Sequence, residues 1–157
     1  MKTKAEQVIA CLRARGLTLA TAESCTGGLI GKLLTDVPGA SSVYKGGVIS
    51  YVNEIKHRLL GVEQQTLDVC TAVSRETAHE MAHGVRERCA ADCGVSVTGL
   101  AGPDGDGTGR PVGLVYIAID AEGYSFCRQL QLSGSRAEIR EQAAEAVLEL
   151  ILEFENQ

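Results

Sequence analysis

The stretch LTLATAESCTGG, residues 17–28, decides the fold of this chain. Its first half, residues 17–22, is a short apolar run, which predicts a buried strand. Its second half is polar, ends in two glycines and leads into the apolar stripe of a helix near residues 27–36. A strand, a tight turn and a helix in this order are the opening unit of an α/β domain.

The rest of the chain continues this alternation. Further helices are expected over residues 3–15, 54–60 and 75–91 and from Ser135 onwards, and further strands over residues 44–51, 95–98, 114–120 and 125–132. Residues with capping chemistry begin three of these helices: Asn53, Ser74 and the capping-box pair Ser135 and Glu138. The last two strands flank the turn Glu122-Gly123 and predict a hairpin. This order predicts a layered α/β/α fold, one domain over residues 1–157 with a mixed sheet.

Composition and charge exclude several classes of function. The chain has 157 residues, of which 45% are hydrophobic and 22% charged, as in ordinary globular domains. Its net charge of -5 and its 4% of aromatic residues argue against binding to nucleic acid. No apolar run has the length of a membrane span and no signal-peptide pattern is present, so we expect a cytoplasmic protein with no membrane partner. Most of its six cysteines are then expected to be reduced.

The turn after the first strand is the first candidate for chemistry. The start of a helix presents unpaired backbone N–H groups and the positive end of a dipole, and glycines let a substrate approach them. Such a turn suits an oxyanion hole or a phosphate cradle, and Ser24 and Cys25 both place a nucleophile in it. The alternative is that Ser24 or Thr26 only caps the helix.

A serine nucleophile needs a base, and Lys56 is the candidate. It lies in the first turn of its predicted helix, where the helix dipole disfavours a positive charge, although Glu54 acts in the opposite sense. Tyr51, at the end of the preceding strand, is a candidate polar partner. The alternatives are a solvated surface lysine and an edge tyrosine. Sequence spacing alone does not place Lys56 beside Ser24.

A second glycine-rich stretch, residues 98–111, follows the strand at 95–98. Loops at the carboxyl ends of strands bind ligands in α/β proteins, so we expect this one to contact substrate through residues such as Thr98, Gly99 and Gly102. It matches neither the dinucleotide fingerprint nor the P-loop signature. Asp104 and Asp106 match part of a calcium loop, but the other ligands of that loop are absent. The alternative is a flexible loop without a ligand.

Two arginines open the last predicted helix. Arg136 and Arg140 lie one helical turn apart, and with Ser133 and Ser135 they are candidates for gripping a phosphate. Alternatively, Arg140 pairs with a neighbouring glutamate on the same helix.

The segment His79-Glu80-Met81-Ala82-His83 matches the zinc-protease pattern H-E-x-x-H on a predicted helix. A zinc site needs a third ligand, for which Glu87, one turn beyond His83, is a candidate. Five-residue motifs recur by chance, and the longer zinc-protease motif does not continue here. We therefore favour ordinary boundary histidines and predict neither a metal nor a cofactor.

Six ordered segments carry a resemblance to a known family. They are TAESCTGG at 21–28, VISYVNEIK at 48–56, LLGV at 59–62, AVS at 72–74, TGLAGPDG at 98–105 and PVG at 111–113. The set is similar to the C-terminal domain of the CinA competence/damage-inducible proteins, the nicotinamide-nucleotide amidohydrolase family. Larger relatives carry an extra N-terminal domain, so this chain resembles the stand-alone form.

The resemblance implies a chemistry and a set of roles. The family hydrolyses the carboxamide of nicotinamide mononucleotide, giving nicotinate mononucleotide and ammonia, by a Ser/Lys mechanism. Its nucleophile falls on Ser24, its base on Lys56 and its assisting tyrosine on Tyr51. The threonine and the glycines of the same motif fall on Thr26, Gly27 and Gly28. The implied partner is thus a small pyridine nucleotide.

One departure and two alternatives stay open at this point. Relatives usually have Gly-Asp-Arg before the final helix, where this chain has Gly134-Ser135-Arg136. The resemblance therefore does not determine how this segment contacts the substrate. Cys25 is an alternative nucleophile. A non-enzymatic alternative is a nucleotide-binding or partner-binding module linked to competence or DNA damage. We also expect a homo-oligomer, which is common among small metabolic enzymes.

Overall fold

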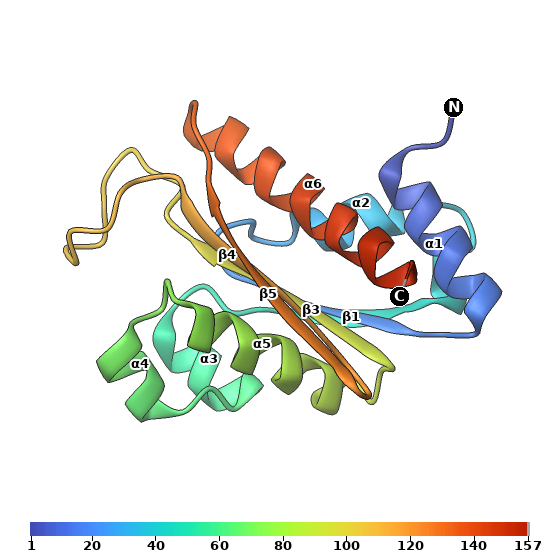
Figure 1. Cartoon of the computed structure of the whole chain (residues 1–157), viewed down its shortest axis with the longest axis horizontal. Helices are drawn as coiled ribbons and strands as arrows, with labels where there is room; N and C mark the ends of the chain where they lie inside the picture. The colour runs from blue at the N-terminus through green and yellow to red at the C-terminus, as the bar shows by residue number, and fades with distance from the viewer. Residues whose placement is uncertain (157) are drawn as a thin grey trace.

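Five strands form one mixed sheet across the middle of the molecule (Figure 1). The computed structural model describes residues 1–156. Its strands are β1 Leu19–Glu23, β2 Tyr44–Ile49, β3 Cys93–Gly99, β4 Leu114–Ala121 and β5 Tyr124–Gln131, in the order β2-β1-β3-β4-β5. The first three pair in parallel, whereas β4 pairs antiparallel with both β3 and β5. The predicted hairpin around Glu122-Gly123 is therefore confirmed.

Six α-helices in the described residues cover the two faces of this sheet (Figure 1). One face carries α1 Lys4–Arg15, α2 Leu29–Thr35 and α6 Arg136–Glu155, and the other carries α3 Asn53–Leu60, α4 Gln64–Cys70 and α5 Arg75–Arg88. A short 3-10 turn, Ala40–Ser42, leads into β2. The predicted layered α/β/α domain with a mixed sheet is confirmed. Residue 157, the predicted end of the domain, lies outside the described residues.

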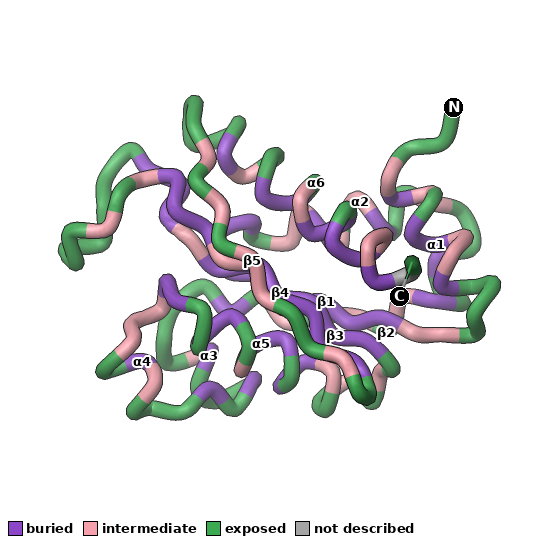
Figure 2. The backbone as a smooth tube through the Cα atoms, in the orientation of Figure 1, coloured by how far each residue is buried: buried purple, intermediate pink, exposed green. Residues whose placement is uncertain are grey.

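Buried residues lie where the helices face the sheet (Figure 2), and their apolar side chains form a core on each face of the sheet. On one face, Leu12 of α1, Ile30 of α2 and Val147 of α6 are fully buried. On the other face, α5 packs against the small alanines of β1, in a cluster that includes Ala20, Ala22, Met81 and Val85. β1 is buried along its whole length because helices cover it from both sides. None of the helices within residues 1–156 combines the length and the apolar composition that a bilayer crossing requires.

Side-chain caps fix several of the predicted helix starts. Ser74 accepts a hydrogen bond from the backbone N–H three residues further on, and Ser135 and Glu138 form the predicted capping box. The prediction of Asn53 as a cap is wrong, because the N-cap position falls on Val52 and Asn53 is the first helical residue. The side chain of Asn53 is thereby left for another role, and it lines the pocket described below.

Parallel pairing brings three loops to the same edge of the sheet. β1, β2 and β3 run in one direction, so the chain leaves all of them at one edge, through Ser24, Ser50 and Leu100. Ligands of α/β sheets bind at such an edge. The topology alone therefore gathers the two glycine-rich stretches and the segment that precedes Lys56.

Candidate active site

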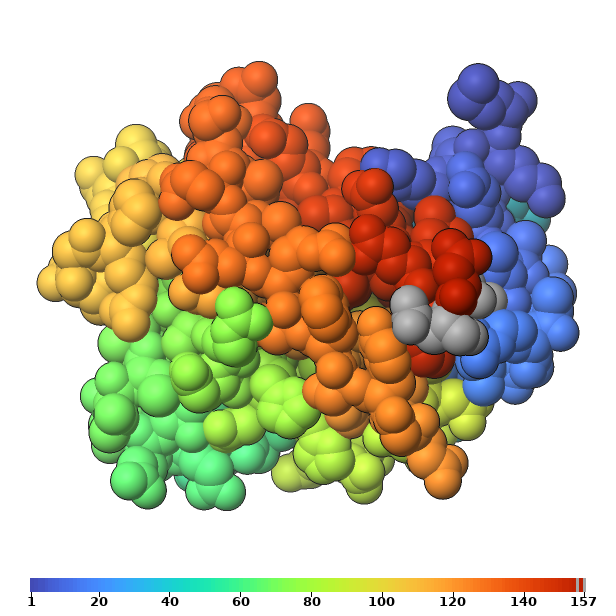
Figure 3. All heavy atoms as spheres, in the orientation of Figure 1, coloured from blue at the N-terminus to red at the C-terminus, as the bar shows by residue number. Residues whose placement is uncertain are grey.

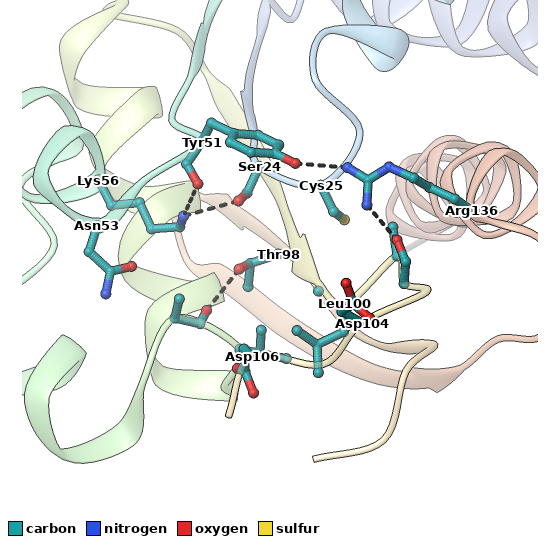
Figure 4. Close-up of a pocket in the computed structure, with 15 residues that line it drawn as sticks. Ser24, Cys25, Tyr51, Asn53, Lys56, Thr98, Leu100, Asp104, Asp106 and Arg136 are labelled. Atoms are coloured by element: carbon teal, nitrogen blue, oxygen red, sulfur yellow. Dashed lines mark hydrogen bonds between the residues drawn. The ribbon is translucent and has the colours of Figure 1, made fainter. Parts of the chain in front are cut away.

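A pocket of about 280 Å³ opens at the edge where the three parallel strands end (Figure 4). Its walls come from the turn after β1, the start of α3, the segment before α5, the loop after β3 and the start of α6. The lining residues are Ser24, Cys25, Tyr51, Asn53, Lys56, Ala72, Val73, Thr98, Gly99, Leu100, Ala101, Gly102, Asp104, Asp106 and Arg136. Segments that are far apart in the sequence thus meet in one site.

Ser24 is the first residue after β1, and its backbone is fixed on both sides. Its N–H donates to the carbonyl of Val97 on β3 at 3.0 Å, and its carbonyl accepts from the N–H of Gly27 at 3.1 Å. Its Oγ lies 3.0 Å from Nζ of Lys56. The contact between the two side chains, which sequence spacing alone did not establish, is therefore present in the fold.

Lys56 is buried, with 1% of its surface exposed. Its Nζ donates to Ser24 Oγ at 3.0 Å and to the carbonyl of Tyr51 at 3.4 Å (Figure 4). It also donates to the carbonyl of Ser50 at 2.9 Å. These partners are uncharged, and burial lowers the pKa of the Lys56 ammonium to about 8. A neutral amine here has two N–H bonds for the two carbonyls and a lone pair for the serine hydroxyl. The arrangement suits a serine and its base.

The cause of this lowered pKa differs from the one expected from the sequence. α3 begins at Asn53, which puts Lys56 at the end of the first turn, but the lowered pKa arises from burial. Glu54, expected to act in the opposite sense, pairs instead with Arg58 at 3.2 Å on the exposed side of the helix. The alternative of a solvated surface lysine is wrong, because packing encloses the side chain.

Cys25 is the second candidate nucleophile of the same turn. It lines the pocket beside Ser24 and is 5% exposed. Burial raises the pKa of its thiol to about 11, so the thiolate, which is the reactive form, is scarce near neutral pH. The amine of Lys56 is hydrogen-bonded to the Ser24 hydroxyl. Both observations favour the serine over the cysteine.

Arg136 ties together two segments on opposite sides of the pocket. From the first residue of α6, it donates to the hydroxyl of Tyr51 at 2.8 Å and to the carbonyl of Gly102 at 2.6 Å (Figure 4). Tyr51 is 56% exposed, and its backbone carbonyl contacts Lys56 while its hydroxyl accepts from Arg136. Arg136 thus supplies a cation at the edge of the pocket.

The glycine-rich loop between β3 and β4 borders the pocket and projects from one end of the molecule (Figures 1 and 3). At its base, the N–H of Leu100 donates to the carbonyl of Leu114 at 2.9 Å. The hydroxyl of Thr98 donates to the carbonyl of Ala72 at 2.8 Å and fixes the segment before α5 (Figure 4). The residues of this stretch that reach the pocket include three expected to bind substrate, Thr98, Gly99 and Gly102, and the two acids Asp104 and Asp106.

Four other residues expected to bind substrate do not line the pocket: Thr26, Gly27, Gly28 and Arg140. The hydroxyl of Thr26 donates to Glu23 at 2.6 Å. Arg140 donates through Nε to the carbonyl of Cys25 and through an Nη atom to that of Thr26, both at 3.0 Å. The two arginines of α6 therefore point to different places, one to the rim of the pocket and one to the backbone of the turn.

Glu23 is a residue of this region that the sequence analysis did not single out. It is the last residue of β1 and is 2% exposed. Its carboxylate accepts from the Thr26 hydroxyl and from the N–H groups of Gly28, Ile30 and Gly31. The signal in the sequence is a carboxylate directly after an apolar run. Its burial, however, follows only from the position of α2 over the strand end.

Comparison with known proteins decides the family. The profile of the CinA C-terminal domain matches residues 1–154. The chain belongs to the CinA C-terminal domain family. The resemblance inferred from the motifs is thereby confirmed.

This CinA domain is similar to proteins from several bacteria. It is 46% identical over 146 residues to a CinA-like protein of Kosmotoga olearia, which covers 93% of this chain and 35% of that protein. The chain spans about a third of the length of the curated relatives it matches. A competence/damage inducible protein of Agrobacterium tumefaciens has the same fold, with a TM-score of 0.93, 41% identity and coverage of 98% of this chain and 94% of the other. For a CinA superfamily protein of Klebsiella pneumoniae the TM-score is 0.94, the identity 31% and the coverage 99% of both chains.

The residues of the zinc-protease pattern on α5 of this CinA domain make hydrogen bonds to neighbouring elements. Nδ1 of His79 lies 3.0 Å from Oγ of Ser125, and Nδ1 of His83 lies 2.9 Å from the carboxylate of Asp120. Glu80 accepts hydrogen bonds from the region where α4 begins. The motif thus connects α5 to β4, β5 and α4, and among residues 1–156 no three such side chains converge as metal ligands.

Proposed function

We propose that this CinA domain hydrolyses the carboxamide of nicotinamide mononucleotide to nicotinate mononucleotide and ammonia, with Ser24 as nucleophile and Lys56 as base. The observation that carries the proposal is the buried contact of 3.0 Å between Ser24 Oγ and Lys56 Nζ. An amine with a pKa of about 8 is neutral in a useful fraction of molecules near neutral pH. The motifs shared with the amidohydrolase family support the same assignment.

In the acylation step, Lys56 takes the proton of the Ser24 hydroxyl as Oγ bonds to the carboxamide carbon. The electrons of the carbonyl bond move onto its oxygen, and backbone N–H groups of the turn after β1 stabilise this oxyanion. When the intermediate collapses, the C–N bond breaks and the Lys56 ammonium gives its proton to the departing nitrogen. Ammonia leaves, and Lys56 is neutral again.

In the second step, water attacks the acyl-enzyme. Lys56 takes a proton from the water as its oxygen bonds to the acyl carbon. The second oxyanion collapses, the bond between carbon and Ser24 Oγ breaks, and Lys56 returns the proton to the serine. One amide and one water give one acid and one ammonia with no change of oxidation state, so the chain's own residues suffice for each step.

Arg136 is the proposed ligand of the substrate phosphate. A guanidinium has five N–H donors, and the hydrogen bonds to Tyr51 and Gly102 leave others for an anion. The side chain of Ser135 caps α6, and aspartate, which relatives usually have there, also caps helices well. The departure from the family pattern therefore leaves the start of α6, and with it Arg136, in place.

The walls of the pocket suit the rest of the substrate. Thr98, Gly99 and Gly102 supply the surface on the side of the glycine-rich loop. A volume of about 280 Å³ is near the lower end for ligand pockets and fits a mononucleotide better than a dinucleotide. Four residues that do not line the pocket are proposed to hold the turn after β1 in its conformation: Thr26, Gly27, Gly28 and Arg140.

The test is ammonia release from nicotinamide mononucleotide by the wild type and by Ser24→Ala and Lys56→Ala. Each variant is expected to lose about a thousandfold or more in kcat, because the pair acts as a unit. Ser41→Ala and Lys32→Ala, at exposed positions, are the matched controls. Cys25→Ala is expected to keep most of its activity, whereas an inactive Cys25→Ala with active Ser24→Ala would transfer the nucleophile to the thiol.

Other outcomes separate the remaining candidates. Near wild-type turnover by Ser24→Ala or Lys56→Ala rejects the mechanism. Tight nucleotide binding without turnover by the wild type favours a binding module, the candidate that fits the names of relatives as competence/damage inducible proteins. A comparison of the mononucleotide with its riboside and with free nicotinamide tests the role of Arg136, because only the first carries a phosphate. The expected homo-oligomer stays a prediction, which light scattering of the purified protein checks.

A further inference from the structure

The backbone of the turn between β1 and α2 is almost saturated with hydrogen bonds. The N–H of Ser24 donates to Val97, the N–H of Gly27 donates to the carbonyl of Ser24, and the N–H of Gly28 donates to Glu23. The carbonyls of Cys25 and Thr26 accept from Arg140. Within the described chain, the N–H groups of Cys25 and Thr26 have no protein acceptor. Of these two residues only Cys25 lines the pocket, so its N–H is the one that a ligand bound there can reach.

Glu23 removes the start of α2 from the list of possible oxyanion donors. One of its carboxylate oxygens accepts from the Thr26 hydroxyl at 2.6 Å and from the N–H groups of Gly28 and Ile30 at 3.2 and 2.9 Å. The other oxygen accepts from the N–H of Gly31 at 2.9 Å. A buried negative charge already occupies the positive end of this short helix. A substrate oxyanion therefore has no place there.

Arg140 holds the same turn from the other side. Its two bonds of 3.0 Å to the carbonyls of Cys25 and Thr26 turn these oxygens toward α6. A planar guanidinium makes both bonds in a fixed fork, which a lysine ammonium does not reproduce. Gly27 has a φ of +60°, and a side chain there would meet the guanidinium at 3.1 Å, so the approach of Arg140 depends on this glycine.

We propose that Glu23 and Arg140 form a clamp that positions the turn so that the N–H of Cys25, which lines the pocket beside Ser24, is its oxyanion donor. Glu23 accepts from the amides at the start of α2 and Arg140 donates to the carbonyls of the turn, so the N–H of Cys25 is left as a donor next to Ser24. Both clamp residues are positioning residues, since neither lines the pocket. The inference rests on the proposed Ser/Lys hydrolysis, and it moves the oxyanion donor from the start of the helix, where the sequence suggested it, to the amide directly after Ser24.

The test uses Glu23→Gln and Arg140→Lys in the full chain. In Glu23→Gln the new side chain keeps the shape of the carboxylate but presents an NH₂ group where the N–H of Gly31 or its neighbours need an acceptor. Removal or misalignment of oxyanion donors lowers kcat by about 100-fold. KM is expected to stay within about 3-fold, because the residues that line the pocket are unchanged. The double variant is expected to lose much less than the product of the two single effects, because both act on one turn.

Two matched controls and a substrate-independent measurement accompany the kinetics. Glu141→Gln and Arg88→Lys make the same changes at exposed positions and are expected to behave as wild type. The rate at which a fluorophosphonate labels Ser24, followed by mass spectrometry, reports the same oxyanion donor without the substrate. Circular dichroism and urea unfolding identify any variant that fails to fold, and if Glu23→Gln does so, Arg140→Lys decides the question.

The outcomes are distinct. The clamp is supported when kcat and the labelling rate fall together while KM stays constant. It is overturned when both variants keep kcat and labelling within about 3-fold of wild type, or when KM rises as much as kcat falls. A wild type that releases no ammonia but is labelled at Ser24 faster than the variants rejects the proposed substrate and keeps the clamp. A wild type that neither releases ammonia nor is labelled at Ser24 rejects both the proposed function and the clamp.

Discussion

In the proposed mechanism the most consequential single residue is Lys56, because its protonation state would decide when Ser24 can react. With a pKa of about 8, about a tenth of the amines are neutral at pH 7. Only the neutral form accepts a proton, so kcat/KM is expected to rise roughly tenfold from pH 6 to pH 7 and to level off above pH 8. Ammonia release measured from pH 6 to 10 checks this. A flat or falling profile below pH 8 would exclude Lys56 as the base.

The burial of Lys56 also lowers the free energy of unfolding of the protein. The pKa of Lys56 is about 8 in the folded state against an ordinary 10.5, so between these values the unfolded chain binds a proton that the folded chain lacks. Wild-type stability therefore rises with pH across this window. Lys56→Met is expected to be more stable than wild type at pH 7 by about 1–3 kcal/mol, and the gap is expected to narrow by pH 10.

Urea unfolding of both proteins at the two pH values measures this difference. Lys32→Met, at an exposed position paired with Asp36, is the control and is expected to change little. Equal stability of wild type and Lys56→Met at pH 7 would mean that the buried amine carries no penalty.

At the scale of single residues, the sequence identified site candidates where a reactive side chain stands directly after a predicted strand. Ser24 stands in a strand-turn-helix unit, and Lys56 follows the next strand, so both were candidates before their contact was known. The burial that lowers the pKa of Lys56 depends on packing between segments and has no local signal. Glu23 was missed for the same reason, since an isolated carboxylate is normally exposed and only the approach of α2 encloses it.

Among the elements, α5 depends on a close approach that a glycine makes possible. Gly84 faces the end of α3, and a Cβ at this position would overlap the backbone carbonyl of Leu60. Because the obstacle is backbone, α5 would have to shift. Gly84→Ala is expected to lower the free energy of unfolding by about 1–3 kcal/mol, despite the better helix propensity of alanine.

The midpoint of urea unfolding checks this effect. Gly105→Ala is the control, because its nearest non-neighbouring atom, the carbonyl oxygen of Arg110, lies at an ordinary contact distance of 3.9 Å. An unchanged midpoint for Gly84→Ala would show that α5 and α3 slide apart without cost.

Periodicity and caps predicted every strand and most helices, and the failures have local causes. α4, Gln64–Cys70, was not predicted because it is short and buries Leu67 alone, so no apolar stripe marks it. Asn53 has the chemistry of a cap, yet the helix begins one residue earlier than the cap rule suggests. The alternation of strands and helices, by contrast, was sufficient for the layered fold.

For the whole molecule, net charge limits the possible partners. A chain with a net charge of -5 has little to gain from the release of counterions by DNA, whatever the names of its relatives suggest. We expect no binding to short single-stranded or double-stranded DNA in fluorescence anisotropy, even at about 50 mM salt. Salt-sensitive binding at micromolar protein would contradict this and revive the DNA-related alternative.

The bonds from Arg140 to the carbonyls of Cys25 and Thr26 join residues more than a hundred positions apart, with sequence separations of 115 and 114. During synthesis, Ser24 is made more than a hundred residues before the side chain that bonds to its turn. An unfinished or C-terminally degraded chain therefore carries Ser24 without the support of Arg140.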